Sequence, residues 1–343
     1  MAYFAGIDIS QRQVSICVLD QEGKRLWRGK CLTDPVVITA TLEEKVPDGR
    51  MTLGLETGPL SPWLVHSLRQ AGLSVVCLDA RAVHAALSTR VNKNDQNDAE
   101  GLAQILRLGW YRPVHVKSYE AHRVRAMLGA RAQLVGMVVR LSNQVRGLLK
   151  VFGIVVAGVR GASFGRRVEE LVTGRPEVAE IVRPLLEAWR MLRQKVAGLD
   201  TALRAQARTR DDCRLLMTVP GVGAITALAF ASAVDDPARF RRSRDVGAHL
   251  GLTPRQYQSG EMDCSGAVSR CGDRYVRTLL FEAATTLLSR VQRWSAPKAW
   301  AVRLAKRAGM NKARTALARK LAVLLHTIWR RGEPFRWGAA VAA

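Results

Sequence analysis

Short apolar runs separated by polar turns fill the first third of the chain, and long helical repeats follow. Apolar residues cluster, or alternate with the period of two that is typical of strands, over 3–9, 14–19, 24–30, 51–55 and 73–78. Helical periodicity appears over 62–70, 81–88 and 98–108. Three consecutive strands followed by β–α–β units predict an α/β domain over residues 1–118, with a mixed sheet flanked by helices.

Apolar positions then repeat at intervals of three and four over residues 119–212, which predicts an all-α, coiled-coil region. One seam consists of Leu134, Val138, Leu141, Val145 and Leu148. The other consists of Leu185, Trp189, Leu192, Val196, Leu199 and Leu203. Glycines between 153 and 165 predict a loop that joins the two helices. The seams fit either an antiparallel pair within one chain or an oligomer, and the sequence leaves both open.

Residues 213–337 predict a third, mainly helical domain. Its candidate chemistry lies in an interhelical turn near residue 220 and in a Gly/Ser-rich loop over 259–272. The turn reads Pro-Gly-Val-Gly and carries Gly221 and Gly223 at a helix start, where exposed backbone amides suit a phosphate. It resembles the hairpin of helix-hairpin-helix DNA-binding modules. An ordinary interhelical turn explains the same residues equally well.

The net charge of the chain indicates that it binds a polyanion. Lysine and arginine number 53 against 29 acidic residues, a formal net charge of +24. Such an excess repels itself in a compact chain unless a polyanion neutralises it, which favours nucleic acid. No apolar run approaches the roughly 20 residues of a membrane span. With no signal-peptide pattern at its start, we expect a cytoplasmic, nucleoid-associated protein. The six scattered cysteines favour neither disulfides nor zinc.

The basic residues are concentrated in two stretches. Between 112 and 167 the only acid is Glu120, and from 291 onward the only acid is Glu333. A charge run is usually a solvated face, but a run of one sign favours polyanion binding. The predicted contacts from the first stretch are Arg123, Arg131, Arg146 and Lys150.

Four carboxylates stand at places where metal-dependent chemistry needs them. Asp8 and Glu56 end two predicted strands, and Asp95 and Asp98 lie three residues apart at a helix start, so they share a face. Carboxylate oxygens bind hard divalent cations, and two such ions about 4 Å apart stabilise in-line phosphoryl displacement. As alternatives, Asp95 alone fits a helix N-cap and Asp8 alone fits a turn residue.

Ser259 precedes Gly260 in the Gly/Ser-rich stretch and is a candidate nucleophile. Four nearby arginines, Arg255, Arg270, Arg274 and Arg277, are candidates to neutralise the charge on a phosphate. A serine needs a base or a metal to become nucleophilic, and no histidine lies nearby in the sequence. A serine that merely forms a turn is the simpler explanation for the Ser-Gly pair alone.

These motifs, in this order, resemble DEDD insertion-sequence transposases of the IS110 type. The acidic motifs are Gly-Ile-Asp-Ile-Ser at 6–10, Gly-Leu-Glu-Thr-Gly at 54–58 and Lys-Asn-Asp-Gln-Asn-Asp-Ala at 93–99. The resemblance implies an RNase H/RuvC-like N-terminal domain in which Asp8, Glu56, Asp95 and Asp98 bind Mg²⁺, with Mn²⁺ as a substitute. It departs from the pattern at Gln11, Arg270 and Cys271.

The resemblance extends to the C-terminal segment, where the family's serine matches Ser259. It implies a serine that attacks DNA covalently, a site shared between domains of different subunits, a dimer or tetramer, and a structured guide RNA. A nuclease or junction resolvase that activates water, with Ser259 only binding phosphate, is the alternative enzyme. A non-catalytic nucleic-acid-binding protein is a third alternative, and the presence of all four acids argues against it.

Overall fold

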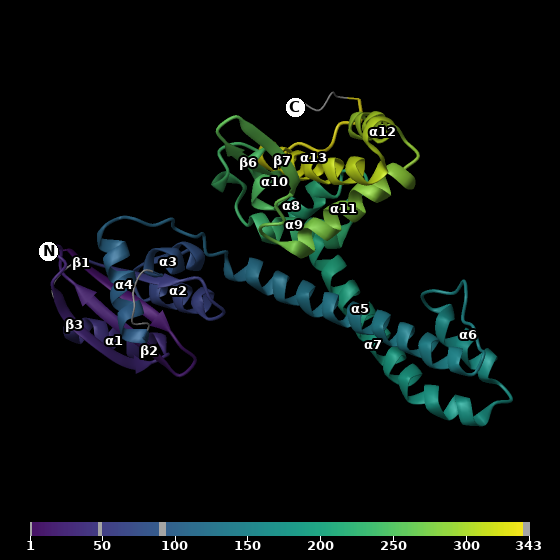
Figure 1. Cartoon of the computed structure of the whole chain (residues 1–343), viewed down its shortest axis with the longest axis horizontal. Helices are drawn as coiled ribbons and strands as arrows, with labels where there is room; N and C mark the ends of the chain where they lie inside the picture. Colours follow the sequence, from purple (N-terminus) through teal and green to yellow (C-terminus); the bar gives the residue numbers. More distant parts are fainter. Residues whose placement is uncertain (1, 47–49, 89–93, 339–343) are drawn as a thin grey trace. The chain divides into compact units, whose positions relative to one another are not determined.

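The computed structural model describes residues 2–46, 50–88 and 94–338, and these fall into two compact units, Met1–Tyr119 and Glu120–Ala343 (Figure 1). The second unit contains both the coiled-coil region and the C-terminal helices. The division into three parts at residues 118 and 212 therefore stays a prediction.

A five-stranded mixed sheet forms the centre of the first unit. Its strands are β1 (Ala2–Ile9), β2 (Gln13–Leu19), β3 (Arg25–Leu32), β4 (Arg50–Glu56) and β5 (Ser74–Leu78). Their order is β3-β2-β1-β4-β5, with β1, β2 and β3 antiparallel and β1, β4 and β5 parallel. This arrangement confirms the predicted mixed sheet.

Helices cover both faces of this sheet. They are α1 (Pro35–Lys45), α2 (Ser61–Gln70), α3 (Ala80–Leu87) and α4 (Asp95–Arg107). Ile38 and Leu42 of α1 and Leu64 of α2 pack with Ile7 and Leu55 on one face. Helix α4 lies on the other face, where Ala99 and Ala103 pack with Cys17 and Leu19 of β2.

Helix α1 was not predicted, because its β-branched residues Val36, Val37, Ile38 and Thr39 favour strand. A helix N-cap at Asp34 favours the helix instead. The Asp34 carboxylate accepts hydrogen bonds from the amides of Val36 and Val37, and Pro35 occupies the first turn, where its missing N–H costs nothing.

The second unit contains an antiparallel helical hairpin built from α5 (Tyr119–Val151) and α7 (Pro176–Thr209), with α6 (Ser163–Val172) packed at its closed end (Figure 1). The Trp189 indole donates to the Ser142 hydroxyl at 2.9 Å, and Arg131 pairs with Asp200. The two seams therefore meet within one chain. The predicted loop over 153–165 is wrong at its end, because α6 begins at Ser163.

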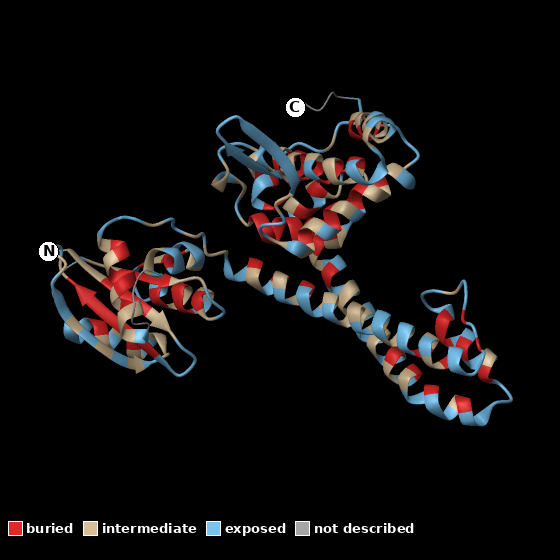
Figure 2. Cartoon of the chain, in the orientation of Figure 1, coloured by how far each residue is buried: buried red, intermediate tan, exposed pale blue. Residues whose placement is uncertain are grey.

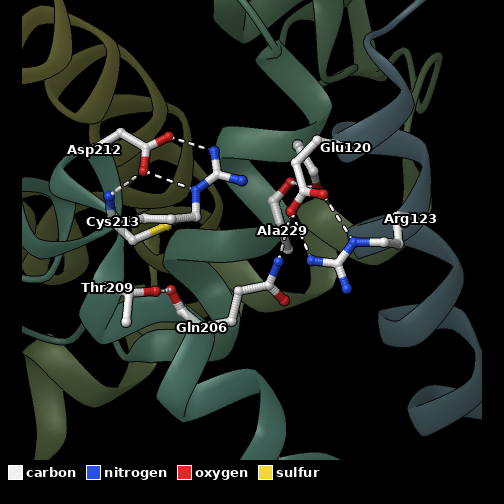
Figure 3. Close-up of polar contacts among 9 residues, drawn as sticks. Glu120, Arg123, Gln206, Thr209, Asp212, Cys213 and Ala229 are labelled. Atoms are coloured by element: carbon white, nitrogen blue, oxygen red, sulfur yellow. Dashed lines mark hydrogen bonds and ion pairs between the residues drawn. The ribbon is translucent and has the colours of Figure 1, made fainter.

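Figure 3 shows a polar junction at the open end of this hairpin. The Glu120 carboxylate accepts two hydrogen bonds from Arg123 and one from Gln206 of α7. Nearby, Asp212 pairs with Arg210 at 2.5 Å and accepts the Cys213 amide. The acids of this basic chain are thus used to join α5, α7 and α8 (Asp211–Leu216).

The C-terminal helices form the largest apolar core. They are α9 (Ala224–Val234), the 3-10 helix η1 (Pro237–Arg239), α10 (Asp245–His249), α11 (Arg274–Ser289), α12 (Ala296–Ala308) and α13 (Met310–Arg331). Helix α9 is buried from Thr226 to Val234 (Figure 2). Helices α7, α8 and α11 pack against it, and α13 packs against α11 and α8 in the same core. Within the described residues, no helix is long and apolar enough to cross a membrane.

The Gly/Ser-rich stretch over 259–272 is not a loop throughout. Strands β6 (Pro254–Ser259) and β7 (Met262–Val268) form a two-stranded antiparallel hairpin that is exposed along nearly its full length (Figure 2). Its glycine and serine content predicts a loop, but the pairing of β6 with β7 depends on contacts between segments that local composition does not encode.

Asp273 joins the C-terminal helices to α5 and provides a test of this packing. Its carboxylate caps α11 through the amides of Tyr275 and Val276 and pairs with Arg125 of α5 at 2.6 Å. Burial raises its pKa, but the Val276 amide and the Arg125 guanidinium outweigh burial and hold the pKa of Asp273 below its usual value.

Asp273→Ala should lower the free energy of unfolding by about 1–2 kcal/mol, and Asp273→Asn by less, because asparagine also caps helices. Since the folded-state pKa is depressed, this stability is present above the unfolded pKa of about 3.9 and is lost as the pH falls through the folded pKa. Urea unfolding at pH 7 and below pH 4 measures both effects. Equal stability of the wild type and Asp273→Ala at pH 7 would contradict the assignment.

Candidate functional site

Register across the sheet places the two strand carboxylates side by side. Asp8 of β1 pairs with Ser15 of β2, and Ser15 pairs with Lys30 of β3. On the other side, Ile7 of β1 pairs with Leu55 of β4, so the next residues, Asp8 and Glu56, are neighbours at the ends of adjacent parallel strands. Paired residues of neighbouring strands point to the same face.

That face is the one covered by α4. Side chains two residues apart on a strand share a face, and Gly6 contacts α4 directly, because a Cβ there would overlap the carbonyl oxygen of Ala99. Asp8 and Glu56 thus point to the side of the sheet on which Asp95 and Asp98 lie.

Two ion pairs give the direction of α4. Lys30, in the row of Asp8, contacts Asp95 at 2.8 Å, whereas Arg28, in the row of Gly6, lies 3.9 Å from Glu100. Helix α4 therefore begins over the row of Asp8 and runs back along the sheet. Its first turn therefore lies beside the row that contains Asp8, at the end of the sheet where the strand carboxylates stand.

Asp95 is not the N-cap of α4. Asn94 takes that place, and its side chain accepts the Asn97 amide at 2.8 Å. Asp95 and Asp98 occupy the first turn, where the helix dipole favours negative charge. The hydrogen bond from Lys30 lowers the pKa of Asp95 further, which keeps this carboxylate ionised. Lys93, the first residue of this acidic motif, lies outside the described residues.

The four carboxylates share a face and an end of the sheet, but they do not form a closed metal cluster. Among residues 2–46, 50–88 and 94–338, no group of three or more His, Cys, Asp or Glu side chains is arranged to hold a metal ion. The donors nevertheless fit a hard divalent cation, because all four are carboxylates on one side of one sheet. Closing the group requires side-chain movement in the first turn of α4, where Asp95 now contacts Lys30.

The turn after β4 is held by Ser61, which sequence reasoning missed. Its buried hydroxyl donates to the Glu56 carbonyl at 2.6 Å and accepts the Gly58 amide at 2.8 Å. Lys30 and Ser15 were also missed as neighbours of the acids. Their only sequence signal is strand periodicity, and the register that places them beside Asp8 is a tertiary property.

Ser259 lies at the tip of the β6–β7 hairpin rather than in an open loop. It pairs with Met262 across a two-residue turn, Gly260-Glu261, in which Gly260 has a φ of 55°. Glycine is favoured at the first position of such turns because positive φ is strained for other residues. The tip therefore presents an exposed serine on a defined backbone.

Two other serines near Ser259, Ser265 and Ser269, are alternative nucleophiles by sequence, but they are placed differently. Ser265 pairs with Gln256, and strand alternation puts that pair on the opposite face of the hairpin from Ser259. Ser269 follows β7, and its amide donates to the Thr253 carbonyl, so it lies at the base of the hairpin.

Glycines and one arginine brace that base. A Cβ on Gly251 would overlap the backbone of Cys271, and one on Gly272 would overlap the His249 carbonyl. Arg277 donates to the carbonyls of Leu250 and Cys271, at 3.1 and 2.6 Å. The structure thus gives Arg277 an internal role, whereas Arg255 and Arg270 are exposed, and Arg270 has a positive φ of 57°.

The predicted nucleic-acid contacts of α5 fall into two groups. Lys150 is exposed, and Arg123 is half-exposed beside Glu120. Arg131 is mostly buried against Asp200, and Arg146 donates to the Val159 carbonyl and stacks over Phe164. Arg131 and Arg146 therefore hold the helical hairpin together.

The Pro-Gly-Val-Gly turn has one glycine that packs against the core and one that is open. Gly221 has a φ of 90°, and a Cβ there would overlap the Ala283 carbonyl of α11, so this position packs against the core. Gly223 is the N-cap residue of α9, and nothing lies within 4 Å of the place of its Cβ. Only the Gly223 side of the turn leaves room for a phosphate.

Two family models match the chain and define its class as a transposase. Residues 5–154 match a model of the DEDD, IS110 type described as "Transposase", and residues 213–301 match the "Transposase IS116/IS110/IS902 family". Together with the relatives below, these matches show that the chain belongs to the IS110 family of DEDD transposases. Membership makes it a DNA-processing, DNA-binding enzyme and implies a divalent metal ion.

Relatives of similar length support this membership. The transposase for insertion sequence element IS1111A of Coxiella burnetii is 30% identical over 97% of this chain and 91% of its own length. A probable family 20 transposase of Pseudomonas aeruginosa is 32% identical over 72% of this chain and 75% of its own. The transposase for IS1328 of Yersinia enterocolitica is 25% identical over 96% and 97%.

Among solved structures, Thermus thermophilus RuvC in complex with a Holliday junction substrate aligns over 33% of this chain and 100% of its own length. The identity is 16% and the TM-score is 0.26.

Lys150 and Arg131 are a matched pair for testing the basic surface of α5. Lys150→Ala should leave stability unchanged and reduce the log–log slope of DNA affinity against salt by about 0.9, if the lysine neutralises one duplex phosphate. Arg131→Ala should instead lower the free energy of unfolding by about 1.5–3 kcal/mol, because it leaves Asp200 without this partner. Salt titrations and urea unfolding separate the two, and a reversed pattern would show that Arg131 is the phosphate ligand.

Proposed function

We propose that this transposase cuts and rejoins DNA with a divalent-metal site formed by Asp8, Glu56, Asp95 and Asp98 and with Ser259 as the nucleophile. The observation that supports the metal site best is the placement of all four carboxylates on the α4 face, at one end of the sheet. Mg²⁺ is the expected ion, since hard cations take carboxylate oxygens. Bound there, it would polarise the phosphoryl group and neutralise its developing charge.

The chain's own groups have separate tasks in this scheme. Asp8 and Glu56, at adjacent strand ends, provide rigid ligands, and Ser61 holds the backbone of Glu56 in place. Asp95 and Asp98 provide ligands on a helix whose first turn favours anions. Lys30 holds Asp95 beside the row of Asp8 until Asp95 turns toward the ion.

The serine step is a phosphoryl transfer. The Ser259 oxygen forms a bond to phosphorus while the bond from phosphorus to one deoxyribose oxygen breaks. The serine proton passes to solvent, and the leaving oxygen takes up a proton. Reversing the step on a second strand end releases Ser259 and rejoins DNA. The hairpin tip suits this task because Ser259 is exposed and no side chain of the core shields it.

An assembly of subunits and a structured guide RNA complete the proposal. Ser259 belongs to the second compact unit and the carboxylates to the first, so one active site can draw on two chains. Much of the α5–α7 seam is only half-buried within one chain, including Leu192, Val196 and Leu199, which leaves apolar surface for a partner. A net charge of +24 suits binding of RNA and DNA together.

Metal binding has a readout that does not depend on activity. Adding Mg²⁺ or Mn²⁺ should raise the melting temperature of the wild type, because a ligand that binds only the folded state stabilises it. Glu56→Gln and Asp8→Asn should abolish this shift. Glu100→Gln is the control, because Glu100 lies on α4 but pairs with Arg25 and Arg28. An undiminished shift in both Asp8→Asn and Glu56→Gln would refute the site.

The serine is tested by a covalent adduct. Protein, element-end DNA, the RNA encoded by the element and Mg²⁺ are mixed, and protein-linked DNA is detected on a denaturing gel. Ser259→Ala should eliminate the adduct and leave DNA affinity within about twofold, since it removes one exposed oxygen. Ser265→Ala, on the other face of the hairpin, is the control. DNA cleavage without any adduct in the wild type would instead favour hydrolysis by water.

The same assay tests the assembly and the RNA. Mixing Ser259→Ala with Glu56→Gln chains should restore adduct on the Glu56→Gln chain if one site uses both subunits. Each variant alone should give none. Failure of the mixture to restore adduct would place both parts of the site in one chain, and full activity without RNA would remove the guide from the proposal.

A further inference from the structure

A cleft of about 870 Å³ lies between the base of the β6–β7 hairpin and helices α12 and α13. Pro254, Gly266, Ala267 and Val268 line it from the hairpin, and Trp300, Ala316 and Val323 line it from the helices. Its volume falls within the range of roughly 300–1,000 Å³ that is usual for small-ligand sites. The small residues of β7 leave this space open beside the larger side chains of α13.

The charge around the cleft has one sign. Arg244, Lys312, Arg319 and Lys320 line it, and no Asp or Glu is among its described lining residues. A site without carboxylates is unsuited to a metal ion or a cationic ligand. A lining of apolar residues and cations fits a ligand with a flat apolar part and negative charge.

Trp300 provides the surface for the flat part. Its ring is half-buried, and the Lys320 ammonium lies 5.0 Å from the ring centroid. Aromatic side chains beside basic residues are the usual platform for unpaired bases, because every base has a face that can stack. Bases within a duplex are already stacked on each other, so only an unpaired base can enter such a cleft.

We propose that this cleft holds one unpaired nucleotide of a DNA strand, with the base on Trp300 and the adjoining phosphates on Lys312, Arg319 and Lys320. The choice of DNA over RNA rests on the proposed function, in which the same hairpin carries Ser259. Ser259 lies five residues after Pro254 along β6, which is about 17 Å at roughly 3.3 Å per residue. A strand held in the cleft is thereby tethered a few nucleotides from the hairpin tip.

Fluorescence anisotropy of the full-length chain with a labelled twelve-nucleotide oligothymidylate tests this site. Trp300→Ala should weaken binding about tenfold or more, because stacking of one base contributes about 1–3 kcal/mol. Ala316→Trp, which fills the cleft without changing charge, should have a similar effect. Trp300→Phe should remain within about threefold of the wild type, which separates stacking from a folding defect.

Two matched controls lie on the neighbouring segment. Trp294 is exposed and has the Lys298 ammonium 5.1 Å from its ring, yet it lies outside the cleft, so Trp294→Ala should leave binding unchanged. Lys306→Ala removes the same charge as Lys312→Ala from an exposed position on α12 and should have the smaller effect. A twelve-base-pair duplex should bind all variants within about twofold of the wild type.

Each other outcome overturns the inference. Unchanged oligothymidylate binding in Trp300→Ala and Ala316→Trp would show that the cleft is empty of bases. Equal losses for the duplex would show a general DNA surface. A twelve-nucleotide oligouridylate that binds more tightly and loses more in Trp300→Ala would show that the occupant is RNA. The assay involves no strand cleavage, so a missing serine adduct would refute the proposed chemistry without affecting this result.

Discussion

The direct contact between Gly6 and helix α4 is the constraint on which the candidate site depends. With no side chain at Gly6, the backbone of α4 lies against β1, and its first turn comes to the end of the sheet where Asp8 and Glu56 stand. Any side chain at Gly6 would lift the helix by the width of a methyl group or more. The first turn of α4, with Asp95 and Asp98, would then lie farther from the carboxylates of the two strands.

Acidic residues are scarce in this chain, which makes the grouping of four carboxylates at one end of the sheet significant. With 29 acids against 53 basic residues, most acids of the second unit are used in its own framework. Glu120 and Asp212 join helices at the open end of the helical hairpin, Asp200 pairs with Arg131, and Asp273 caps α11 and pairs with Arg125. These pairs use acids for contacts between helices, and the excess of positive charge that remains can be neutralised by a polyanion.

The β6–β7 hairpin differs from the helical core around it in how it is exposed and held in place. Its strands are exposed, but its base is fastened by Gly251, Gly272 and Arg277, whose interactions are all with backbone. The hairpin thus combines a braced base with an exposed tip, where Ser259 lies. The cleft with Trp300 lies at the same base, so the position of a strand there and the position of the tip are mechanically linked.

The sequence by itself determined the order of the five sheet strands and of the two long helices, and the identity of the candidate chemical groups. Period-two runs predicted all five strands of the sheet, heptad seams predicted α5 and α7, and the motifs around Asp8, Glu56 and Asp95 indicated the family. These properties are local, because each is encoded in a few consecutive residues. The N-cap at Asp34 is also a local signal, but the β-branched residues that follow it favour strand, so α1 is not predicted from the sequence.

Only the tertiary structure decided which of these groups meet. Register placed Lys30 and Ser15 in the row of Asp8, and packing gave Arg131, Arg146 and Arg277 contacts inside the fold. Pairing of β6 with β7 made a hairpin of a presumed loop and opened the cleft beside Trp300. Each outcome depends on contacts between residues that are far apart in the chain. Local patterns in a single sequence do not identify those contacts.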